Sequence, residues 1–216
     1  KEVDEIPDES IAIFSAHGVP EDVEISANSR NFKYFDATCP LVTKVHLEVK
    51  KHAKQGRDII LIGHKGHPEV VGTLGRHPKH SNTKIILVET ENDVKNLNVN
   101  GEKLACVTQT TLSVDETKEI ISALKKKFPK IVGPNADDIC YATQNRQDAV
   151  KQLSLESDLV IVIGSKSSSN SNRLKEIAEK CGTASCLIDG YEDFNTNLLE
   201  DKKVVGITAG ASAPEY

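Results

Sequence analysis

Short apolar runs alternate with longer segments of helical period along nearly the whole chain. Most of the runs are almost continuously apolar, which is typical of strands buried on both faces of a parallel sheet. They lie at 11–15, 32–36, 58–63, 84–88, 104–108, 131–132, 159–164, 185–188 and 204–208. Amphipathic stretches lie between several of them, at 42–55, 114–128, 144–153 and 172–181. The alternation of strand and helix predicts an α/β fold.

Composition narrows the class of protein further. The chain has 216 residues, of which 38% are hydrophobic and 27% are charged, enough for one large domain or two to three small ones. A net charge of −5 argues against nucleic acid or an anionic membrane as partner. No apolar run approaches the roughly 20 residues of a membrane span, and no signal peptide is visible. We therefore expect a cytoplasmic protein.

Both ends of the chain are unusual for a complete domain. The chain opens with Lys1 in a polar stretch, without a Met, and it stops two residues after Pro214. Because proline is favoured in the first turn of a helix, a helix is expected to begin there. We expect the chain to be an internal fragment of a longer protein.

The cysteines indicate thiol chemistry rather than disulfides. They are odd in number, far apart and without a CxxC pair, which favours reduced thiols. Cys39 and Cys140 each precede a predicted helix, where the dipole favours thiolate. Two such thiolates can ligate a soft metal or an iron–sulfur cluster. The alternative is that both are small buried hydrophobes, and that is the interpretation for the remaining cysteines, Cys106, Cys181 and Cys186.

Polar side chains follow the predicted strands at one end. Thiols, imidazoles, hydroxyls or amides come directly after most of the apolar runs, and ligands of open α/β sheets bind at the carboxyl ends of strands. For any single position we favour a turn or helix cap, since Ser, Thr and Asn commonly serve there. For the whole set we favour one shared pocket.

Two serine-containing loops predict an anion site. Residues 167–170 read Ser-Ser-Ser-Asn and lie between a buried strand and a helix expected to begin near Asn172. Free N–H groups, hydroxyls and an amide bind anions there without Lys or Arg. The loop around Ser212, after Gly210, follows the same logic. The loop at 167–170 is not a P-loop, because the GxxxxGK[ST] spacing is absent. The alternative is a flexible solvated loop, but the pair makes a diphosphate or sugar-phosphate ligand plausible.

Four further side chains complete the candidate chemistry. His17 and His67 can add positive charge to an anion site, since small shifts move imidazole across neutral pH. Glu69 can deliver a proton if burial raises its pKa, and Thr110 can position a substrate hydroxyl or a water. Each has a simpler alternative: a capping His, a surface Glu or a strand-end Thr. The remaining histidines of the polar stretches are expected to face solvent: His46, His52, His77 and His80.

Taken together, these segments resemble the LytB/IspH family of hydroxymethylbutenyl diphosphate reductases. The matching stretches span nearly the whole chain in family order. They are FSAHGV at 14–19, FDATCPLVTKVH at 35–46, IGHKGHPE at 62–69, TQTTLS at 108–113, DICYAT at 138–143, 164–173, and TAGASAP at 208–214.

The resemblance implies a fold, a cofactor and residue roles. The fold is three small α/β domains with mainly parallel sheets around a central cluster and substrate cavity, divided here as 1–39, 40–136 and 137–216. A [4Fe–4S] cluster is held by three cysteines, of which the third is expected upstream of Lys1. The matching positions are Cys39 and Cys140 for the cluster, His17, His67, Ser168, Ser169, Asn170 and Ser212 for the diphosphate, Glu69 for the proton and Thr110 as its partner.

The implied activity is an oxidoreductase that ends the non-mevalonate isoprenoid route. It removes the hydroxyl of (E)-4-hydroxy-3-methylbut-2-enyl diphosphate with electrons from reduced ferredoxin or flavodoxin, giving isopentenyl and dimethylallyl diphosphate. Without the third thiolate, residues 1–216 alone are expected to be inactive. One alternative is a phosphosugar- or nucleotide-binding module without redox chemistry. Another is a zinc hydrolase that uses Cys39, Cys140 and His67, with Glu69 as base.

Overall fold

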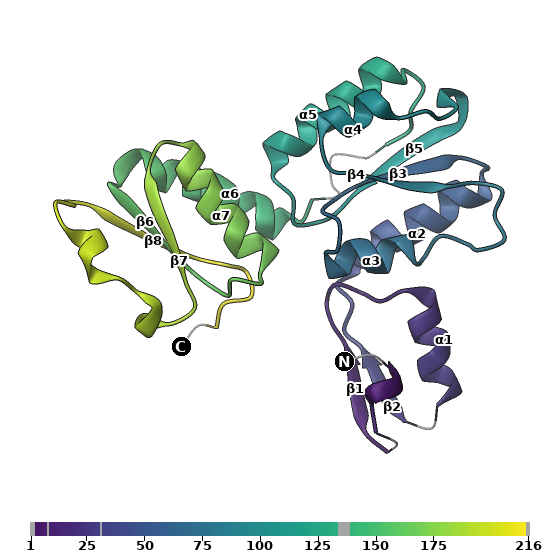
Figure 1. Cartoon of the computed structure of the whole chain (residues 1–216), viewed down its shortest axis with the longest axis horizontal. Coiled ribbons are helices and arrows are strands. Elements are labelled where there is room, and N and C mark those ends of the chain that lie inside the picture. The colour runs from purple at the N-terminus through teal and green to yellow at the C-terminus, as the bar shows by residue number, and fades with distance from the viewer. Residues whose placement is uncertain (1–2, 8, 31, 134–138, 215–216) are drawn as a thin grey trace. The chain divides into compact units, whose positions relative to one another are not determined.

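The computed structural model describes residues 3–7, 9–30, 32–133 and 139–214 (Figure 1). It confirms the α/β class, because every pair of neighbouring strands in its three sheets is parallel. The chain forms two compact units, residues 1–110 with 115–138 and residues 111–114 with 139–216. Among the described residues, no helix is long and apolar enough to cross a membrane.

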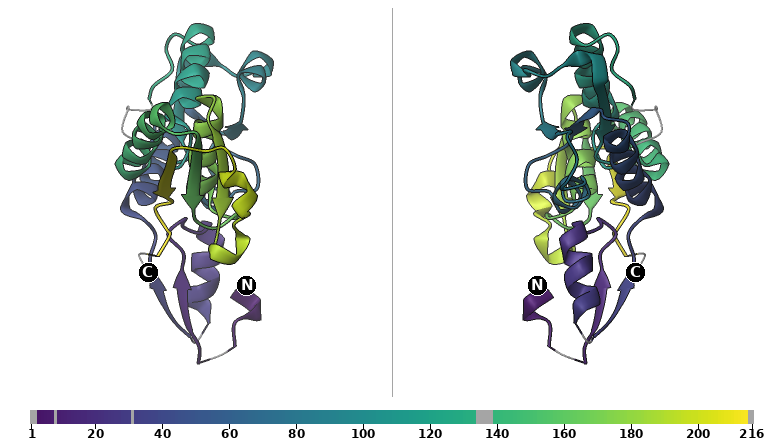
Figure 2. Two further views of the ribbon diagram at one scale, coloured as in Figure 1. Left: turned by 90° about the vertical axis from the view of Figure 1, so that its left-hand side faces the viewer. Right: turned by 90° about the vertical axis from the view of Figure 1, so that its right-hand side faces the viewer.

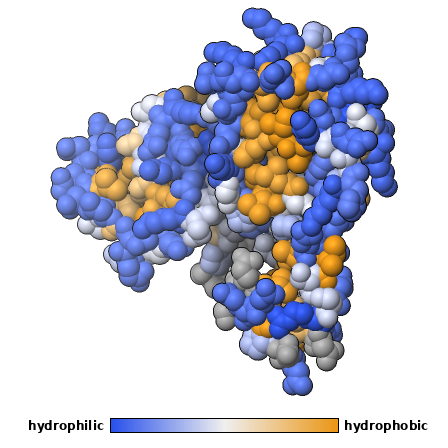
Figure 3. All heavy atoms as spheres, turned by 45° about the vertical axis from the view of Figure 1, so that its right-hand side comes forward, coloured by the Kyte–Doolittle hydropathy of each residue, from blue (hydrophilic) through white to orange (hydrophobic). Residues whose placement is uncertain are grey.

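The first sheet has two strands, β1 (Ile11–Phe14) and β2 (Lys33–Asp36), joined through helix α1 (Glu21–Ser29). Phe14, Ala27 and Phe32 form its core, so α1 covers one face. Alternate residues of a strand point to opposite faces, and Ile11, Ile13 and Phe35 are exposed. Figure 3 shows apolar side chains reaching the surface on the face that it presents. A short 3-10 helix, Val3–Glu5, precedes this sheet.

The second sheet is built from the most apolar runs. Its strand order is β4-β3-β5, with helices on its faces. Val45 and Val49 of α2 lie at helical spacing and pack with Ala53 against Ile59 and Leu61 in a buried core. The elements are α2 (Pro40–Lys54), β3 (Asp58–Ile62), α3 (Pro68–Leu74), β4 (Ile85–Val88), α4 (Glu91–Asn96), a 3-10 turn Gly101–Lys103, β5 (Leu104–Thr108) and α5 (Val114–Lys127).

The third sheet repeats this plan in the second unit, with the order β7-β6-β8. Helices α6 and α7 run beside each other and share a buried core with Val160 and Val162 of β6 (Figures 1 and 2). The elements are α6 (Tyr141–Glu156), β6 (Leu159–Ile163), α7 (Ser169–Lys180), β7 (Ala184–Ile188), two 3-10 turns (Tyr191–Asp193 and Thr196–Leu199) and β8 (Val205–Ala209).

Strand order creates a similar crevice in each three-stranded sheet. From the central strand the chain first adds a neighbour on one side and then crosses to the other side. Such a reversal leaves a crevice at the carboxyl ends, where ligands bind. In the second sheet it lies beyond Ile62 and Thr108, which are paired. In the third it lies beyond Ile163 and Ala209. The loops after these four residues hold most of the predicted site.

The structure corrects several predicted boundaries. The run at 131–132 forms only an isolated bridge, between Val132 and Ala105. Helix α6 begins at Tyr141, directly after Cys140 as predicted, whereas α7 begins at Ser169, earlier than predicted, because its first turn carries polar residues. The short helices α1, α3 and α4 were not expected. The division into three domains stays a prediction, and its boundary at 136/137 lies outside the described residues, as do residues 215–216.

Candidate active site

Glu69 and Thr110 meet at the crevice of the second sheet. The backbone N–H of Thr110 donates to Oε1 of Glu69 at 2.6 Å, and the Thr110 hydroxyl donates to Oε2 at 3.0 Å. Glu69 lies in the first turn of α3, after β3, and Thr110 follows β5. The two residues are 41 positions apart in sequence and come together because β3 and β5 are neighbours.

Burial changes the chemistry of this carboxyl group. Only 2% of Glu69 is exposed. Burial raises its pKa to about 7, and the two hydrogen bonds from Thr110 oppose that rise by favouring the charged form. A carboxylic acid with a pKa near neutrality holds a proton and also releases it readily, as a proton donor in catalysis must.

Two histidine rings lie beside each other near Glu69. The His17 and His67 rings are 5.4 Å apart between centroids, in an edge-to-face arrangement. His67 caps α3, and its Nδ1 accepts the backbone N–H of Glu69 at 3.2 Å. Burial, with His17 and His64 nearby, lowers the pKa of His67 to about 4. A neutral ring that accepts through Nδ1 carries its proton on Nε2, so His67 presents an N–H donor. His17 is exposed.

Gln109, which directly follows β5, is a further site residue, and no role was predicted for it. It is almost fully buried, and its Oε1 accepts the backbone N–H of His64 at 3.0 Å. The bond ties the end of β5 to the loop that leads from β3 to His67. In the sequence, only its position between Thr108 and Thr110 at the end of a strand suggests a site residue. That position does not show what the side chain contacts.

The serine loop of the third sheet is partly a helix cap. The Ser168 hydroxyl accepts the backbone N–H of Ser171, which confirms the simpler capping interpretation for that residue. Ser169 accepts a hydrogen bond from the Thr111 hydroxyl at 3.1 Å. Asn170 is only 6% exposed, and both polar atoms of its amide have no partner among the described residues. A buried unsatisfied amide is costly, so Asn170 is suited to a ligand.

Ser171 joins this loop to the one that holds Ser212. A Cβ atom at Gly164 would lie 2.3 Å from the Ser171 Oγ, and one at Gly210 would lie 2.1 Å from it. Gly164 follows β6, and Gly210 follows β8. The serine is therefore wedged between two glycines at the crevice of this sheet. Ser212 lies exposed in the turn after Gly210.

Cys39 and Cys140 occupy equivalent positions in the two units. Each is the N-cap of a helix, α2 and α6 respectively, and neither side chain caps its helix. Both are half-buried free thiols, so their chemistry and position fit cluster ligands. Cys106 is buried, as expected, and Cys186 is half-buried. Cys181 is exposed, which corrects its interpretation as a buried residue. Within the described residues, no three of His, Cys, Asp and Glu form a metal-binding group.

The prediction for the other histidines was wrong in most cases. His46 and His52 are buried on α2, and His77 is half-buried; burial lowers the pKa of each. His80 is exposed, as expected. Both errors on α2 have one cause. Each histidine lies on a buried side of the helix, but its neighbours in sequence include polar residues, so the sequence suggested that the histidine is exposed. The roles assigned to the candidate site residues stay predictions.

Known proteins resemble the whole chain. The LytB protein family matches residues 1–216. The 4-hydroxy-3-methylbut-2-enyl diphosphate reductase of Chromohalobacter salexigens is 60% identical over 216 residues, all of this chain and 68% of that protein. The protein of the same name in Saccharophagus degradans is 59% identical over 215 residues, 99% of this chain and 69% of that protein.

Solved structures agree with these relatives. The E-1-hydroxy-2-methyl-but-2-enyl-4-diphosphate reductase of Plasmodium falciparum matches with a TM-score of 0.92 at 41% identity, covering 99% of this chain and 66% of that one. A second reductase, described as the terminal enzyme of the non-mevalonate pathway, matches with a TM-score of 0.65 at 35% identity, covering 100% of this chain and 75% of that one.

The chain thus spans about two thirds of the length of most of these relatives. All of them are reductases, which favours the reductase over the phosphosugar-binding alternative. The chain belongs to the LytB family, the reductases of 4-hydroxy-3-methylbut-2-enyl diphosphate.

Proposed function

We propose that the protein encoded by the complete reading frame of this chain reduces (E)-4-hydroxy-3-methylbut-2-enyl diphosphate to isopentenyl and dimethylallyl diphosphate. The allylic C–O bond breaks, and the hydroxyl leaves as water. Two electrons and two protons enter, one proton going to the departing oxygen and one to carbon. Its relatives bear the name of this activity, and the carboxyl chemistry of the second sheet suits it.

The observation that carries the proposal is the buried Glu69 carboxyl held by Thr110. A departing hydroxyl needs a proton as its C–O bond breaks, because hydroxide is a poor leaving group. Glu69 has its pKa raised to about 7 by burial, so much of it carries a proton near neutral pH. Thr110 fixes the orientation of the carboxyl through two hydrogen bonds. General acids of this kind contribute about 10²- to 10⁴-fold in rate.

The diphosphate end of the substrate requires donors rather than acids. His67 offers an Nε2–H, since its Nδ1 accepts the Glu69 backbone, and the His17 ring lies beside it. In the second unit the proposed donors are Ser168, Ser169, Asn170 and Ser212. Support comes from the Asn170 amide, which has no partner within the described part of the chain, and from the N–H groups at the start of α7. A bound diphosphate would also stabilise the charged form of His67, opposing the burial that lowers its pKa.

We assign Cys39 and Cys140 as two ligands of a [4Fe–4S] cluster, with a third cysteine outside this chain. When bound, such a cluster supplies the two electrons and a Lewis-acidic iron. Support for the two ligands is the matched N-cap position of both thiols. A reduced ferredoxin or flavodoxin is the proposed electron donor. Residues 1–216 alone are accordingly proposed to show no turnover.

The test uses the protein from the complete reading frame, reconstituted anaerobically with iron and sulfide. Oxidation of a reduced viologen is followed on addition of the allylic diphosphate. Substrate-dependent oxidation that collapses in Glu69→Gln supports the reductase and the proton donor. An intact cluster without oxidation would refute the activity. Zinc retained after aerobic purification, with no iron taken up anaerobically, would support the zinc hydrolase instead.

A further inference from the structure

The turn that carries His17 is held from three directions. It spans Ser15–Gly18, directly after β1, and closes through the Gly18 N–H donating to the Ser15 carbonyl at 3.0 Å. On one side, the Cys39 N–H donates to the Ala16 carbonyl at 3.0 Å. The turn is therefore attached to the proposed cluster ligand through the backbone.

A second contact comes from α3, whose N-cap is His67 and whose first turn contains Glu69. A Cβ atom at Gly72 would lie 3.1 Å from the Gly18 carbonyl oxygen and 3.5 Å from that of His17. The absence of a side chain at Gly72 lets the turn lie directly on α3.

The third contact is His46 of α2. Gly18 has a positive φ of 73°, and a Cβ atom there would lie 2.6 Å from the His46 Cε1 and 3.3 Å from its Nε2. The imidazole edge therefore lies directly against the Gly18 backbone. His46 is only 6% exposed, and its Nε2 has no hydrogen-bond partner among the described residues. Burying a ring nitrogen without a hydrogen-bond partner lowers the stability of the folded state. Stability alone would therefore favour an apolar residue over a histidine at this position.

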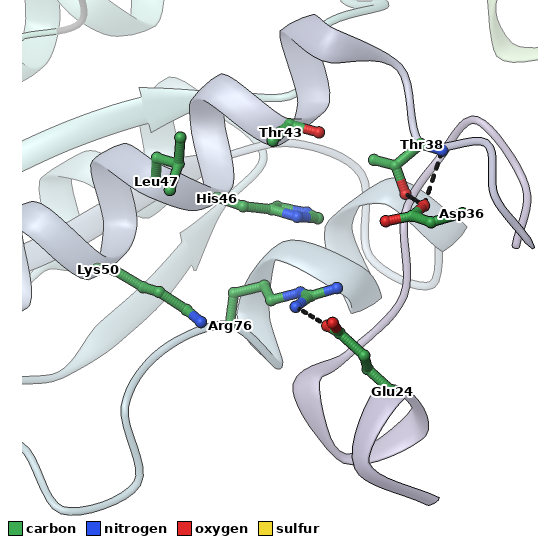
Figure 4. Close-up of a pocket in the computed structure, with 8 residues that line it drawn as sticks. All are labelled: Glu24, Asp36, Thr38, Thr43, His46, Leu47, Lys50 and Arg76. Carbon is green, nitrogen blue, oxygen red and sulfur yellow. Dashed lines mark hydrogen bonds and ion pairs between the residues drawn. The ribbon is translucent and has the colours of Figure 1, made fainter. Parts of the chain in front are cut away.

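His46 also lines a small cavity of about 140 Å³. In Figure 4 the His46 ring extends from α2 toward Thr38 and Asp36, near the Arg76 guanidinium. Arg76 is held by Glu24 at 2.5 Å and by the Val19 carbonyl at 2.8 Å. Burial, then Arg76 and Lys50, lower the pKa of His46 to about 4. The ring is therefore neutral near pH 7 and acts through its shape and contacts.

We propose that His46 is a positioning residue: its ring supports the Ser15–Gly18 turn so that His17 is held where it binds the diphosphate of the substrate. This inference rests on the function proposed above. His46 does not touch the substrate. It acts through Gly18, and the turn contacts both α2 and α3, the helices whose N-caps are Cys39 and His67.

The test measures diphosphate binding without the reduction. Full-length protein is titrated calorimetrically with inorganic pyrophosphate, using wild type, His17→Ala, His46→Ala and the double variant. We expect each single variant to weaken binding about tenfold, as the loss of a hydrogen bond to a charged group does. We expect the double variant to bind no more weakly than the weaker single variant, because both remove one interaction. Wild-type affinity in His46→Ala, or multiplied losses in the double variant, would overturn the proposal.

His52 offers a matched control on the same helix. It is equally buried, its Nδ1 has no hydrogen-bond partner among the described residues, and burial also lowers its pKa. His52→Ala should cost similar thermal stability and leave pyrophosphate affinity unchanged. If His46→Ala does not fold, His46→Gln keeps a nitrogen near Nε2 and should show an intermediate affinity. A general structural role would lower affinity equally in His46 and His52 variants, contrary to the proposal.

Steady-state kinetics separate this inference from the proposed function. If wild type reduces the substrate and His46→Ala raises KM with kcat retained, both the proposed function and the positioning role of His46 are supported. If wild type reduces the substrate but His46→Ala and His52→Ala have the same KM and pyrophosphate affinity, only the inference fails. If pyrophosphate binding depends on His46 and His17 but no reduction occurs, only the function fails.

Discussion

The Glu69 carboxyl group receives a backbone and a side-chain hydrogen bond from one residue, Thr110. Both hydrogen bonds become charge-assisted when Glu69 is ionised, so they favour the carboxylate form, whereas burial favours the protonated form. The balance leaves the pKa of Glu69 at about 7 rather than higher. Thr110 therefore tunes the acid as well as orienting it, and this relationship gives the first two predictions.

The first prediction concerns the pH dependence of kcat. Because the proton donor must be protonated, kcat should fall as pH rises through about 7. Thr110→Val removes one bond that lowers the pKa, so this limb should move to higher pH. The matched control is Thr108→Val, since the buried Thr108 hydroxyl has no partner among the described residues. A limb that stays in place in Thr110→Val, measured over pH 5.5–9, contradicts the tuning role.

The second prediction concerns stability. Glu69 has a folded pKa raised from 4.5 to about 7, so between these values the folded state binds more protons than the unfolded state. Stability from this group is complete below pH 4.5 and is lost as pH rises through 7, by about 3 kcal/mol. Glu69→Gln should lack this loss. The free energy of unfolding of the variant minus that of wild type should rise over this window, and a flat difference would refute the shift.

The third prediction tests the wedge between the two serine loops. Gly210→Ala should destabilise the protein by about 1–3 kcal/mol, because its Cβ collides with the Ser171 Oγ. Ser171→Gly in the same chain should restore part of that loss. The control is Gly182→Ala, where the added Cβ has open space and only the φ of 88° is strained, at a cost of about 1–2 kcal/mol. Thermal unfolding of the four proteins measures this, and no rescue would show that the collision is not the cause.

The fourth prediction concerns the thiols. In the full-length protein, Cys39→Ser and Cys140→Ser should each lower iron and sulfide content after anaerobic reconstitution, with the circular dichroism spectrum unchanged. Cys181→Ser is the control, because Cys181 is an exposed thiol at the end of α7. Full cluster loading in either N-cap variant would remove that cysteine from the ligand set.

The fifth prediction concerns His67. Its Nδ1 accepts a backbone N–H, so the proposed donor to the diphosphate is Nε2. His67→Gln places an amide N–H near that position, whereas His67→Asn does not reach it. KM for the substrate should rise less in His67→Gln than in His67→Asn. Equal KM values in the two variants would indicate that Nε2 does not bind the substrate.

The sequence determined the fold class and most of the strands. Runs such as 58–63 and 159–164 are so continuously apolar that only burial on both faces of a sheet accommodates them, and β3 and β6 lie there. Polar residues that directly follow such strands predicted a site at the carboxyl ends of the strands. This prediction was possible because an apolar run and the position where it ends are local features of the sequence. The short helices α1, α3 and α4 were not predicted, because a few residues give only a weak helical periodicity.

Only the tertiary structure decided which of these residues act on one another. Pairing of β3 with β5 brings Thr110 onto Glu69, and the buried crevice raises the pKa of that carboxyl. Packing of α2 against the Ser15–Gly18 turn buries His46, which its polar neighbours in sequence make look exposed. Hydrophobic period is a property of a segment and can be read along the chain. Burial and pKa depend on neighbours distant in sequence, so they exist only once the sheets have formed.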